Sequence, residues 1–457
     1  MPEETTPPTD DTRMELTLEG LTGFAKRRGF VFQASEIYGG LAGFWDYGPL
    51  GVELVNNIKA SWWREFVNRR TDMVGLDTSI IQNPTLWKAS GHVDEFVDPM
   101  VDDLVTRKRY RADHLADLDT TDLAKLSEAL KDTLSPDGNP LTEPKMFNLM
   151  FTTNVGAVEG ESTQTYLRPE TAGGIFTNFK NVLDTTRQRL PFGIAQIGKS
   201  FRNELTPGEF IFRVRELEIM ELEYFTKPED APAAFDEFLA LQKEWLASIG
   251  LDPNHLHEYE HPVDGRAHYS DKTIDLEFDY PFGTKEMTGI ANRTNYDLTQ
   301  HAEFSGKDLR YFDEETKQHI VPYVIEPTFG LGRIALAVLC DAYREEEVNG
   351  EKRIVLQLTP EMAPIKAAIL PLSKKPELSS LAKEIFADIA GDWRIEYDET
   401  QSIGKRYRRQ DEIGTPYCIT VDFDSLEDKA VTVRERDTMK QDRIAITNLK
   451  AYLLERL

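Results

Sequence analysis

Arginine and glutamate residues are concentrated in residues 195–225, a segment with the pattern of a β-hairpin. Because side chains alternate along a strand, Arg202 and Glu204 face the same side of its first strand. Thr206-Pro207-Gly208 predicts the turn. On the returning strand, one face would carry Arg215, Leu217, Ile219, Glu221 and Glu223.

This face has the residue types that bind a polyphosphate nucleotide. The planar fork of arginine matches phosphate oxygens, and a carboxylate accepts a hydrogen bond from the adenine amino group. The same residues would suit a solvated hairpin held by cross-strand ion pairs, which is the commoner arrangement in proteins. The segment alone leaves both interpretations open.

A second candidate site lies in residues 322–336, where a strand ends at Glu326-Pro327 and a helix follows. Gly330 and Gly332 allow close backbone approach, and the helix N-terminus, with Arg333 in its first turn, favours an anion. Gly-x-Gly before a helix is also ordinary turn chemistry, so this pattern is weak by itself.

A third candidate is Glu170, which lies between an apolar strand and a helix. Its carboxylate would either cap the helix or bind a ligand, and capping is the commoner role.

The overall composition is that of a soluble globular protein. The chain has 457 residues, 40% of them hydrophobic and 29% charged, which is long enough for about two to four domains. A formal net charge of −26 excludes a non-specific nucleic-acid coat. The residues from Lys366 onward carry 16 basic and 17 acidic side chains, so this part could approach a nucleic acid at the least electrostatic cost.

Neither end of the chain nor its interior indicates a membrane. No apolar run approaches the ~18 residues that span a bilayer. The acidic, proline-rich residues 1–10 are neither a signal peptide nor a transit peptide. We therefore expect a cytoplasmic protein without membrane contact.

Hydrophobic periodicity predicts the regular elements. Helices are expected over residues 15–28, 52–69, 231–249 and from 332 onward, and strands over 77–82 and in stretches from 191 to 291. Residues 31–51 are rich in glycine and aromatic residues, which indicates a tightly folded backbone. The charged residues 98–163 are typical of an insertion. A final α/β region would have strands at 367–370, 393–397, 417–423 and 430–434 and helices at 378–389, 404–413 and 446–457.

Together these segments resemble class II aminoacyl-tRNA synthetases. Arg202-Asn203-Glu204 is similar to motif 2 of that class and Gly330-Leu331-Gly332-Arg333 to motif 3. The long helix through Trp62-Trp63 and the strand to Pro84 resemble motif 1, which builds the dimer interface in that class. Residues 404–416 resemble the anticodon-binding domain of the glycine, histidine, threonine and proline enzymes. Similarity to the homodimeric, single-polypeptide glycyl-tRNA synthetases lies in residues 29–32, 36–40, 45–51, 89–92 and 167–172.

The resemblance implies an α+β fold with two domains and a catalytic function. After a disordered acidic tail (1–13), residues 14–359 would form the class II antiparallel sheet with flanking helices, with the insertion at about 98–163. Residues 360–457 would form a mixed α/β anticodon-binding domain. The implied protein is a cytoplasmic homodimer that uses ATP and Mg²⁺ to convert glycine to glycyl-adenylate and transfers it to the 3′ end of tRNA(Gly).

Roles in ATP binding follow from the resemblance residue by residue. Arg202 would be the catalytic residue that holds the α-phosphate, Glu204 would read the adenine amino group, and Phe212 and Arg333 would flank the adenine ring. The implied ATP-binding set is Arg202, Asn203, Glu204, Phe212, Arg213, Val214, Arg215, Glu216, Leu217, Glu286, Met287, Gly330, Leu331, Gly332 and Arg333.

The implied glycine site is rich in acidic residues. Its set is Arg111, Glu170, Leu217, Glu218, Ile219, Met220, Glu221, Arg293, Glu326, Pro327, Thr328, Phe329 and Gly330. Carboxylates crowding the ammonium group would leave no room for a Cβ, although excluding one methyl group is worth only ~1–3 kcal/mol in an ordinary pocket.

The sequence departs from the family pattern in three places. Some members carry paired cysteines in the insertion, but residues 98–163 contain none, and Cys340 and Cys418 lie far apart, so we expect no zinc. Thr328 stands where serine is usual, which keeps the hydroxyl and adds a methyl group. Residues 283–290, which include Glu286 and Met287, differ from the sequence that is usual in the family at this segment.

A basic run, Lys405-Arg406-Tyr407-Arg408-Arg409, is the expected tRNA contact. In the predicted helix Lys405 and Arg409 share one face with Arg408 beside them, where they could contact a phosphate backbone. Tyr407 could stack on an unpaired base. A solvated basic face paired with acidic neighbours is the commoner explanation for such a run.

Two other functions fit parts of the pattern. A proline or threonine synthetase of the same class would share the fold, but the Tyr38-Gly39-Gly40 wording and the acidic pocket argue against it. A non-catalytic synthetase-like protein would have no reason to keep Arg202, Glu204 and Arg333 together.

Overall fold

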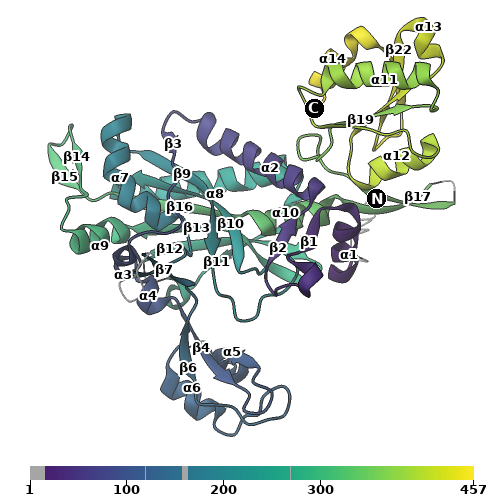
Figure 1. Cartoon of the computed structure of the whole chain (residues 1–457). Helices are drawn as coiled ribbons and strands as arrows, with labels where there is room; N and C mark the ends of the chain where they lie inside the picture. The colour runs from purple at the N-terminus through teal and green to yellow at the C-terminus, as the bar shows by residue number, and fades with distance from the viewer. Residues whose placement is uncertain (1–15, 119, 157–162, 268, 349) are drawn as a thin grey trace, which may run out of the picture.

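In the computed structural model, which describes residues 16–118, 120–156, 163–267, 269–348 and 350–457, a large sheet with its helices carries a projecting insertion and a smaller C-terminal unit (Figure 1). The expected tail, residues 1–13, lies outside the described residues.

The large sheet has seven strands in the order β11-β12-β13-β16-β10-β9-β3. Neighbouring strands are antiparallel, except that β3 pairs with β9 in parallel. Its strands are β3 (Met73–Gly75), β9 (Phe192–Phe201), β10 (Glu216–Thr226), β11 (Leu256–Glu260), β12 (Lys272–Tyr280), β13 (Gly283–Thr294) and β16 (Tyr323–Gly330). This confirms the antiparallel sheet expected from the class II resemblance.

Alternation of side chains along β10 gives the sheet two different faces. Met220, Leu222 and Tyr224 belong to the main hydrophobic core, to which α2 (Pro49–Trp63), α8 (Ala231–Ser248) and α10 (Leu331–Ala342) also contribute. Phe225, on the other face, packs in a second core with residues of α7 (Ala172–Thr186) and α9 (Tyr296–Ser305). The candidate catalytic side chains of β10 lie on this second face.

Two expected N-terminal helices are confirmed. Thr17 caps α1 (Leu18–Arg28) by accepting a hydrogen bond from the Gly20 backbone N–H at 3.0 Å, and Gly29, with φ of 77°, ends it. Strands β1 (Val31–Gln33) and β2 (Trp45–Tyr47) then pair antiparallel. Helix α2 continues as a π-helical turn, Arg64–Asn68, so the segment remains helical nearly to residue 69.

The strand expected over residues 77–82 is wrong. The strand in this region is β3, and Ile81 makes only an isolated bridge with Leu167. The buried Arg168 explains the difference, because its Nη1 donates to the Thr78 carbonyl at 2.7 Å and its backbone N–H to the Ile80 carbonyl at 3.3 Å. One residue, through its side chain and its backbone N–H, thus replaces part of a strand's hydrogen-bonding ladder.

The charged segment forms a unit of its own that projects from the large sheet (Figure 1). Its three-stranded sheet has the order β5-β4-β6, and a small core contains Val101, Ala112, Leu126 and Leu130. Its elements are β4 (Val97–Asp102), β5 (Arg109–Arg111), α5 (Ala112–Ala116), α6 (Leu123–Leu130) and β6 (Lys145–Asn148). Helices α3 (Pro84–Ala89) and α4 (His92–Glu95) precede this unit, and the antiparallel pair β7 (Thr152–Val155) and β8 (Thr163–Tyr166) follows it.

The C-terminal unit has a five-stranded sheet in the order β20-β19-β21-β22-β23, parallel at β19 and antiparallel from β21 onward. Its elements are β19 (Ala367–Pro371), α11 (Pro376–Ile389), β20 (Ile395–Tyr397), α12 (Ile403–Glu412), β21 (Tyr417–Val421), α13 (Asp424–Asp428), β22 (Ala430–Glu435), β23 (Gln441–Ala445) and α14 (Ile446–Leu454). The mixed α/β prediction is confirmed. Strand β23 was not predicted, because an exposed edge strand with little apolar content lacks a strand pattern.

Two further hairpins complete the described structure: β14 (Tyr311–Asp313) with β15 (Gln318–Ile320), and β17 (Tyr343–Val348) with β18 (Glu351–Leu356). The second hairpin follows α10 and reaches the C-terminal unit. None of the described helices has the length and apolar character needed to cross a membrane.

Candidate active site

A cavity of about 420 Å³ lies between β10, the loop of residues 202–215, β13 and the start of α10. It brings together most of the predicted ATP-binding residues: Arg202, Glu204, Phe212, Arg213, Val214, Glu216, Leu217, Glu286, Met287, Gly330, Gly332 and Arg333. Glu218, Ile219 and Thr328, predicted for glycine, also line it. Residues from distant parts of the sequence therefore form one pocket.

The loop after β9 is held by its own arginines. Nε of Arg213 donates to Glu204 Oε2 at 2.8 Å, inside the pocket. Arg215 points away, because its Nε donates to the Glu204 carbonyl at 2.8 Å and its Nη1 to the Ala42 carbonyl at 2.9 Å. Arg215 therefore shapes the loop and does not line the cavity, in contrast to its predicted role.

The two residues expected to flank adenine are in contact with each other. The Arg333 guanidinium carbon lies 4.5 Å from the Phe212 ring centroid, and Arg333 Nη1 lies 2.9 Å from Glu286 Oε2. Tyr280 and Phe282 support the Phe212 ring edge-on, each at 5.2 Å. A purine ring can lie between Phe212 and Arg333 only if Arg333 moves away from the face of the Phe212 ring. Arg333 would then still be held by its ion pair with Glu286.

The positive charge of Arg202 acts on carboxylates in this pocket and in a second, acidic pocket. Its Nε donates to the Pro169 carbonyl at 3.1 Å. Partial loss of hydration in the pocket opposes ionisation of the half-exposed Glu286, but Arg333 and Arg202 lower its pKa. Burial likewise opposes ionisation of Glu170, yet His92, Arg293 and Arg202 lower its pKa to about 2. One guanidinium thus acts on carboxylates at both ends of the site.

The acidic pocket is built around Glu221 on β10. Its Oε2 accepts a hydrogen bond from the Thr171 backbone N–H at 3.1 Å and one from the Thr171 hydroxyl, and its Oε1 accepts from the Thr328 hydroxyl at 3.1 Å. Thr328 thus uses the hydroxyl that serine would supply. One carboxylate oxygen each of Glu221, Glu223 and Glu326 lies within 4.8 Å of the others. Alternation along the strand predicted that Glu221 and Glu223 share a face, and Glu326 joins them from β16.

A buried arginine partly balances this charge. Arg293 donates to Asp297 Oδ2 and Oδ1 at 2.7 and 2.8 Å and to Glu326 Oε2 at 2.8 Å. Burial and the neighbouring Glu326 raise the pKa of Glu223 well above its usual range, which favours the protonated form of Glu223.

Glu170 is ionised but only half satisfied. Its Oε2 lies 3.3 Å from His92 Nε2. Its Oε1 is buried and accepts no hydrogen bond from any described residue. The helix-capping role is excluded, since Thr171 holds the cap position of α7 and Glu221 accepts the Thr171 N–H. A buried carboxylate oxygen in this state favours a cationic ligand.

Several predicted residues lie elsewhere. Met220, Phe329 and Leu331 are fully buried in the main core, and alternation along β16 puts Pro327 on the same side as Phe329. The prediction was made for whole segments, and in these segments the side chains that face the main core do not reach the site.

Two further predicted residues, Arg111 and Asn203, do not line the pocket and instead contact residues of the insertion. Arg111 pairs with Asp98 at 3.0 Å and with Asp113 at 2.5 Å. The backbone N–H of Asn203 donates to the Leu149 carbonyl at 2.7 Å.

Some pocket residues were not predicted. The cavity is also lined by Ala34, Phe44, Trp45, Asp46, Tyr47, Lys199, Ile211 and Thr288. The glycine- and aromatic-rich residues 31–51 were the signal for the first five. Gly51 there lies so close to Phe30 that a Cβ would stand 1.9 Å from the Phe30 carbonyl oxygen. His92, Tyr269 and Asp297 also approach the acidic pocket and had no assigned role.

The basic run of α12 is only partly available to a partner. Arg406 is 2% exposed and donates to the Pro371 and Asp398 carbonyls. The Tyr407 hydroxyl bonds the Thr420 hydroxyl at 2.6 Å, and Arg434 covers its ring. Arg409 pairs with Asp398. The predicted RNA contacts of Arg406 and Tyr407 are therefore wrong, whereas Lys405 is exposed.

Comparisons with known proteins match both parts of the chain. Residues 153–343 match the family described as tRNA synthetase class II core domain (G, H, P, S and T), and residues 366–456 match the family described as anticodon binding domain. The chain is 52% identical to the glycine–tRNA ligase of Geobacillus thermodenitrificans (strain NG80-2), over 97% of this chain and 98% of that one. It is 50% identical to that of Corynebacterium efficiens, over 96% and 98%.

Solved structures of other synthetases share the fold. A threonyl-tRNA synthetase structure from Cryptosporidium parvum Iowa II aligns with a TM-score of 0.66 at 17% identity, covering 95% of this chain and 98% of that one. Giardia lamblia prolyl-tRNA synthetase in complex with prolyl-adenylate aligns with a TM-score of 0.65 at 17% identity, covering 95% and 75%.

Proposed function

The chain belongs to the glycine–tRNA ligase family of class II synthetases, and from that premise we propose that it forms glycyl-adenylate in the described pocket and then charges tRNA(Gly). In the first step the glycine carboxylate attacks the α-phosphate of ATP and pyrophosphate leaves. In the second a hydroxyl of the terminal ribose attacks the adenylate carbonyl and AMP leaves.

The observation that carries this proposal is that Arg202 acts on two carboxylates, one in the acidic pocket proposed for glycine and one in the larger cavity proposed for ATP. Its charge acts on Glu170 in the acidic pocket and on Glu286 in the larger cavity. A glycine whose ammonium lies near Glu170 would direct its carboxylate toward Arg202, where the α-phosphate must also lie. Positioning and charge stabilisation then carry the reaction without a side-chain nucleophile.

Each remaining group has a role in the same proposal. Glu204 would accept from the adenine amino group, and the purine would separate Phe212 from Arg333. Mg²⁺ would arrive with ATP and neutralise phosphate charge. The Glu286 carboxylate, half exposed in the pocket, has the hard oxygen ligands that this ion prefers.

Selection for glycine would come from the acidic pocket. Glu170, Glu221 and Glu326 would surround the ammonium group, with Glu221 fixed by Thr171 and Thr328. Arg293 and Asp297 would hold Glu326 in place. A substrate Cβ would have to enter among these buried, hydrogen-bonded groups.

ATP–pyrophosphate exchange with each amino acid in turn tests the proposed function. We expect exchange with glycine alone. Exchange with proline or threonine would assign the pocket to another class II substrate, and no exchange with any amino acid by a folded protein would favour the non-catalytic alternative.

The cysteine-free insertion predicts that the enzyme works without structural zinc. Elemental analysis after extensive dialysis should find far less than one zinc per chain. Chelator treatment, followed by removal of the chelator and assay with added Mg²⁺, should leave glycine-dependent exchange unchanged. The two cysteines, Cys340 and Cys418, are buried in different parts of the fold. One tightly held zinc per chain would contradict the prediction.

The same proposal covers partners and organisation. We assign residues 14–359 to catalysis, with about 98–163 as the insertion, and residues 360–457 to anticodon binding, consistent with the family match at 366–456. The chain would act as a cytoplasmic homodimer through the motif 1 region of α2. Exposed Lys405 and half-buried Arg408 remain the candidates of α12 for tRNA contact.

A further inference from the structure

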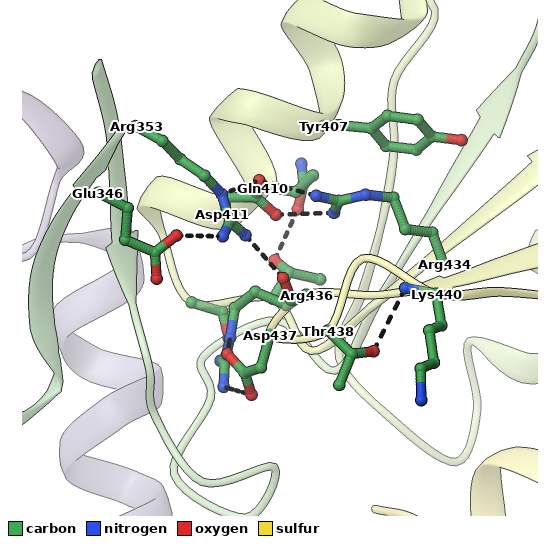
Figure 2. A network of polar contacts seen from close by, with 12 residues as sticks. Glu346, Arg353, Tyr407, Gln410, Asp411, Arg434, Arg436, Asp437, Thr438 and Lys440 are labelled. Carbon is green, nitrogen blue, oxygen red and sulfur yellow. Dashed lines mark hydrogen bonds and ion pairs between the residues drawn. The ribbon is translucent and has the colours of Figure 1, made fainter. Parts of the chain in front are cut away.

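A buried arginine joins the two domains at the β17–β18 hairpin (Figure 2). Arg353 of β18 is 1% exposed, yet it comes from the catalytic side of the chain. Its Nε donates to Asp411 Oδ2 at 2.9 Å and its Nη2 to the Arg436 carbonyl at 2.6 Å. Its Nη1 donates to Glu346 Oε2 of β17 at 2.6 Å, so a residue of its own hairpin orients it.

A second arginine reaches in the opposite direction. Arg436, 3% exposed, follows β22 of the C-terminal unit. Its Nη2 donates at 2.8 Å to the carbonyl of Leu358, in the segment that follows β18. Its Nη1 donates at 2.7 Å to the carbonyl of Gly414, which follows α12 in its own unit. Each side thus sends one arginine to a carbonyl of the other. We call Arg353, Asp411 and Arg436 the interdomain clasp.

The C-terminal unit does not need Arg353 to satisfy its own buried charge. Asp411 also accepts both terminal nitrogens of Arg434, at 2.8 and 3.1 Å. The Arg434 guanidinium in turn lies over the Tyr407 ring, 4.9 Å from its centroid (Figure 2). Asp411 therefore remains paired with Arg434 when Arg353 is removed. The substitution does not leave a buried carboxylate without a partner, which would be strongly destabilising.

Directional hydrogen bonds of this kind contribute more to the angle between the two domains than to the stability of the fold. Replacing a buried ion pair by apolar groups often preserves stability, whereas forked arginine bonds restrict orientation in a plane. The connecting segment is held as well: Nδ2 of Asn57 on α2 donates to the Ala363 carbonyl at 3.0 Å, and Lys366 Nζ donates to the Pro360 carbonyl at 2.8 Å. The joint is thus tied to the helix that packs under the active-site sheet.

We propose that the interdomain clasp sets the orientation of the anticodon-binding domain, and that Arg353 is thereby a positioning residue for tRNA charging. This inference rests on the proposed function. A tRNA bound at its anticodon presents its 3′ end to the active site at a high effective concentration only if the joint has the correct angle. Adenylate formation needs no such alignment.

Replacing Arg353 by methionine tests the clasp, with Lys352→Met as the matched control. Lys352 neighbours Arg353 on β18, but its side chain is 64% exposed and pairs with Glu345 of the same hairpin. For Arg353→Met we expect kcat/KM for full-length tRNA(Gly) to fall about tenfold, the effect of losing a charged hydrogen bond. Glycine-dependent ATP–pyrophosphate exchange should stay within about twofold of wild type. Lys352→Met should match wild type in both assays.

Charging of an acceptor-stem minihelix separates orientation from general destabilisation. The minihelix lacks the anticodon, so its kcat/KM should be equal in wild type and Arg353→Met. Equal losses with minihelix, full-length tRNA and exchange would reduce Arg353 to a structural residue, and unchanged charging of full-length tRNA would overturn the clasp.

Two milder variants keep the test decisive if Arg353→Met does not fold. Arg353→Lys keeps the charge without the fork, and Glu346→Gln weakens the orientation of Arg353 at a site that is one-third exposed. Both should selectively lower charging of full-length tRNA, about two- to fivefold, and wild-type charging in both would refute the proposal. Absence of glycine-dependent exchange in the wild-type protein would instead refute the proposed function, irrespective of the clasp.

Discussion

Replacement of Arg202 by alanine is expected to lower glycine-dependent ATP–pyrophosphate exchange by about 10³-fold, in the range of losses seen when a charge-stabilising group is removed from an acyl- or phosphoryl-transfer site. The Arg202 charge acts on the carboxylates at both ends of the site, and no other described arginine lowers the pKa of both Glu170 and Glu286. Among the described residues its side chain donates one hydrogen bond, to the Pro169 carbonyl, so the fold should tolerate the change.

The control is Arg189→Ala, which removes an exposed arginine just before β9. It should retain wild-type exchange and thermal stability. Arg202→Lys should lie between wild type and alanine, because an ammonium keeps the charge but loses the fork. A folded Arg202→Ala protein with wild-type exchange would refute the assignment of Arg202 to the reacting phosphate.

Most of the residues that the sequence assigned to ATP binding line one cavity, because they lie in short, strongly patterned segments. Arg202 with Glu204 and Gly330 with Arg333 each occupy a strand end or helix start whose local pattern is clear. Arg215 shares that pattern, yet it bonds two backbone carbonyls instead of lining the cavity. Sequence spacing predicts which face a side chain occupies, but not whether a loop carbonyl will capture it.

The acidic pocket shows a second limit. Alternation along β10 correctly grouped Glu221 with Glu223, but the pairing of Glu221 with Thr171 and of Glu170 with His92 depends on α7 and α4 packing over that face. Arg406 and Tyr407 failed for a related reason: α12 turns them toward β19 and β21, and a charge run alone does not reveal which side of a helix is covered.

Replacement of Glu170 by glutamine is expected to raise the KM for glycine at least about 30-fold, since removing one member of a buried, hydrogen-bonded charge pair costs about 2–5 kcal/mol. Glutamine keeps the volume and a hydrogen-bonding oxygen, so the loss would report the charge. The pKa of Glu170 is about 2, below its ordinary value of 4.5, so the group stays ionised at pH 5. The difference from wild type should therefore persist from pH 8 to pH 5, and the KM for ATP should change little.

Glu223→Gln is the matched control on the neighbouring carboxylate. Burial and Glu326 raise the pKa of Glu223 and so favour its neutral form, which an amide of the same size imitates. Its KM for glycine should stay within about threefold of wild type, which is a smaller change than the loss of one hydrogen bond to glycine would cause. If both variants raised the KM equally, the pocket would respond to packing rather than to charge. If neither did, the half-satisfied Glu170 carboxylate would not be the group that binds the glycine ammonium.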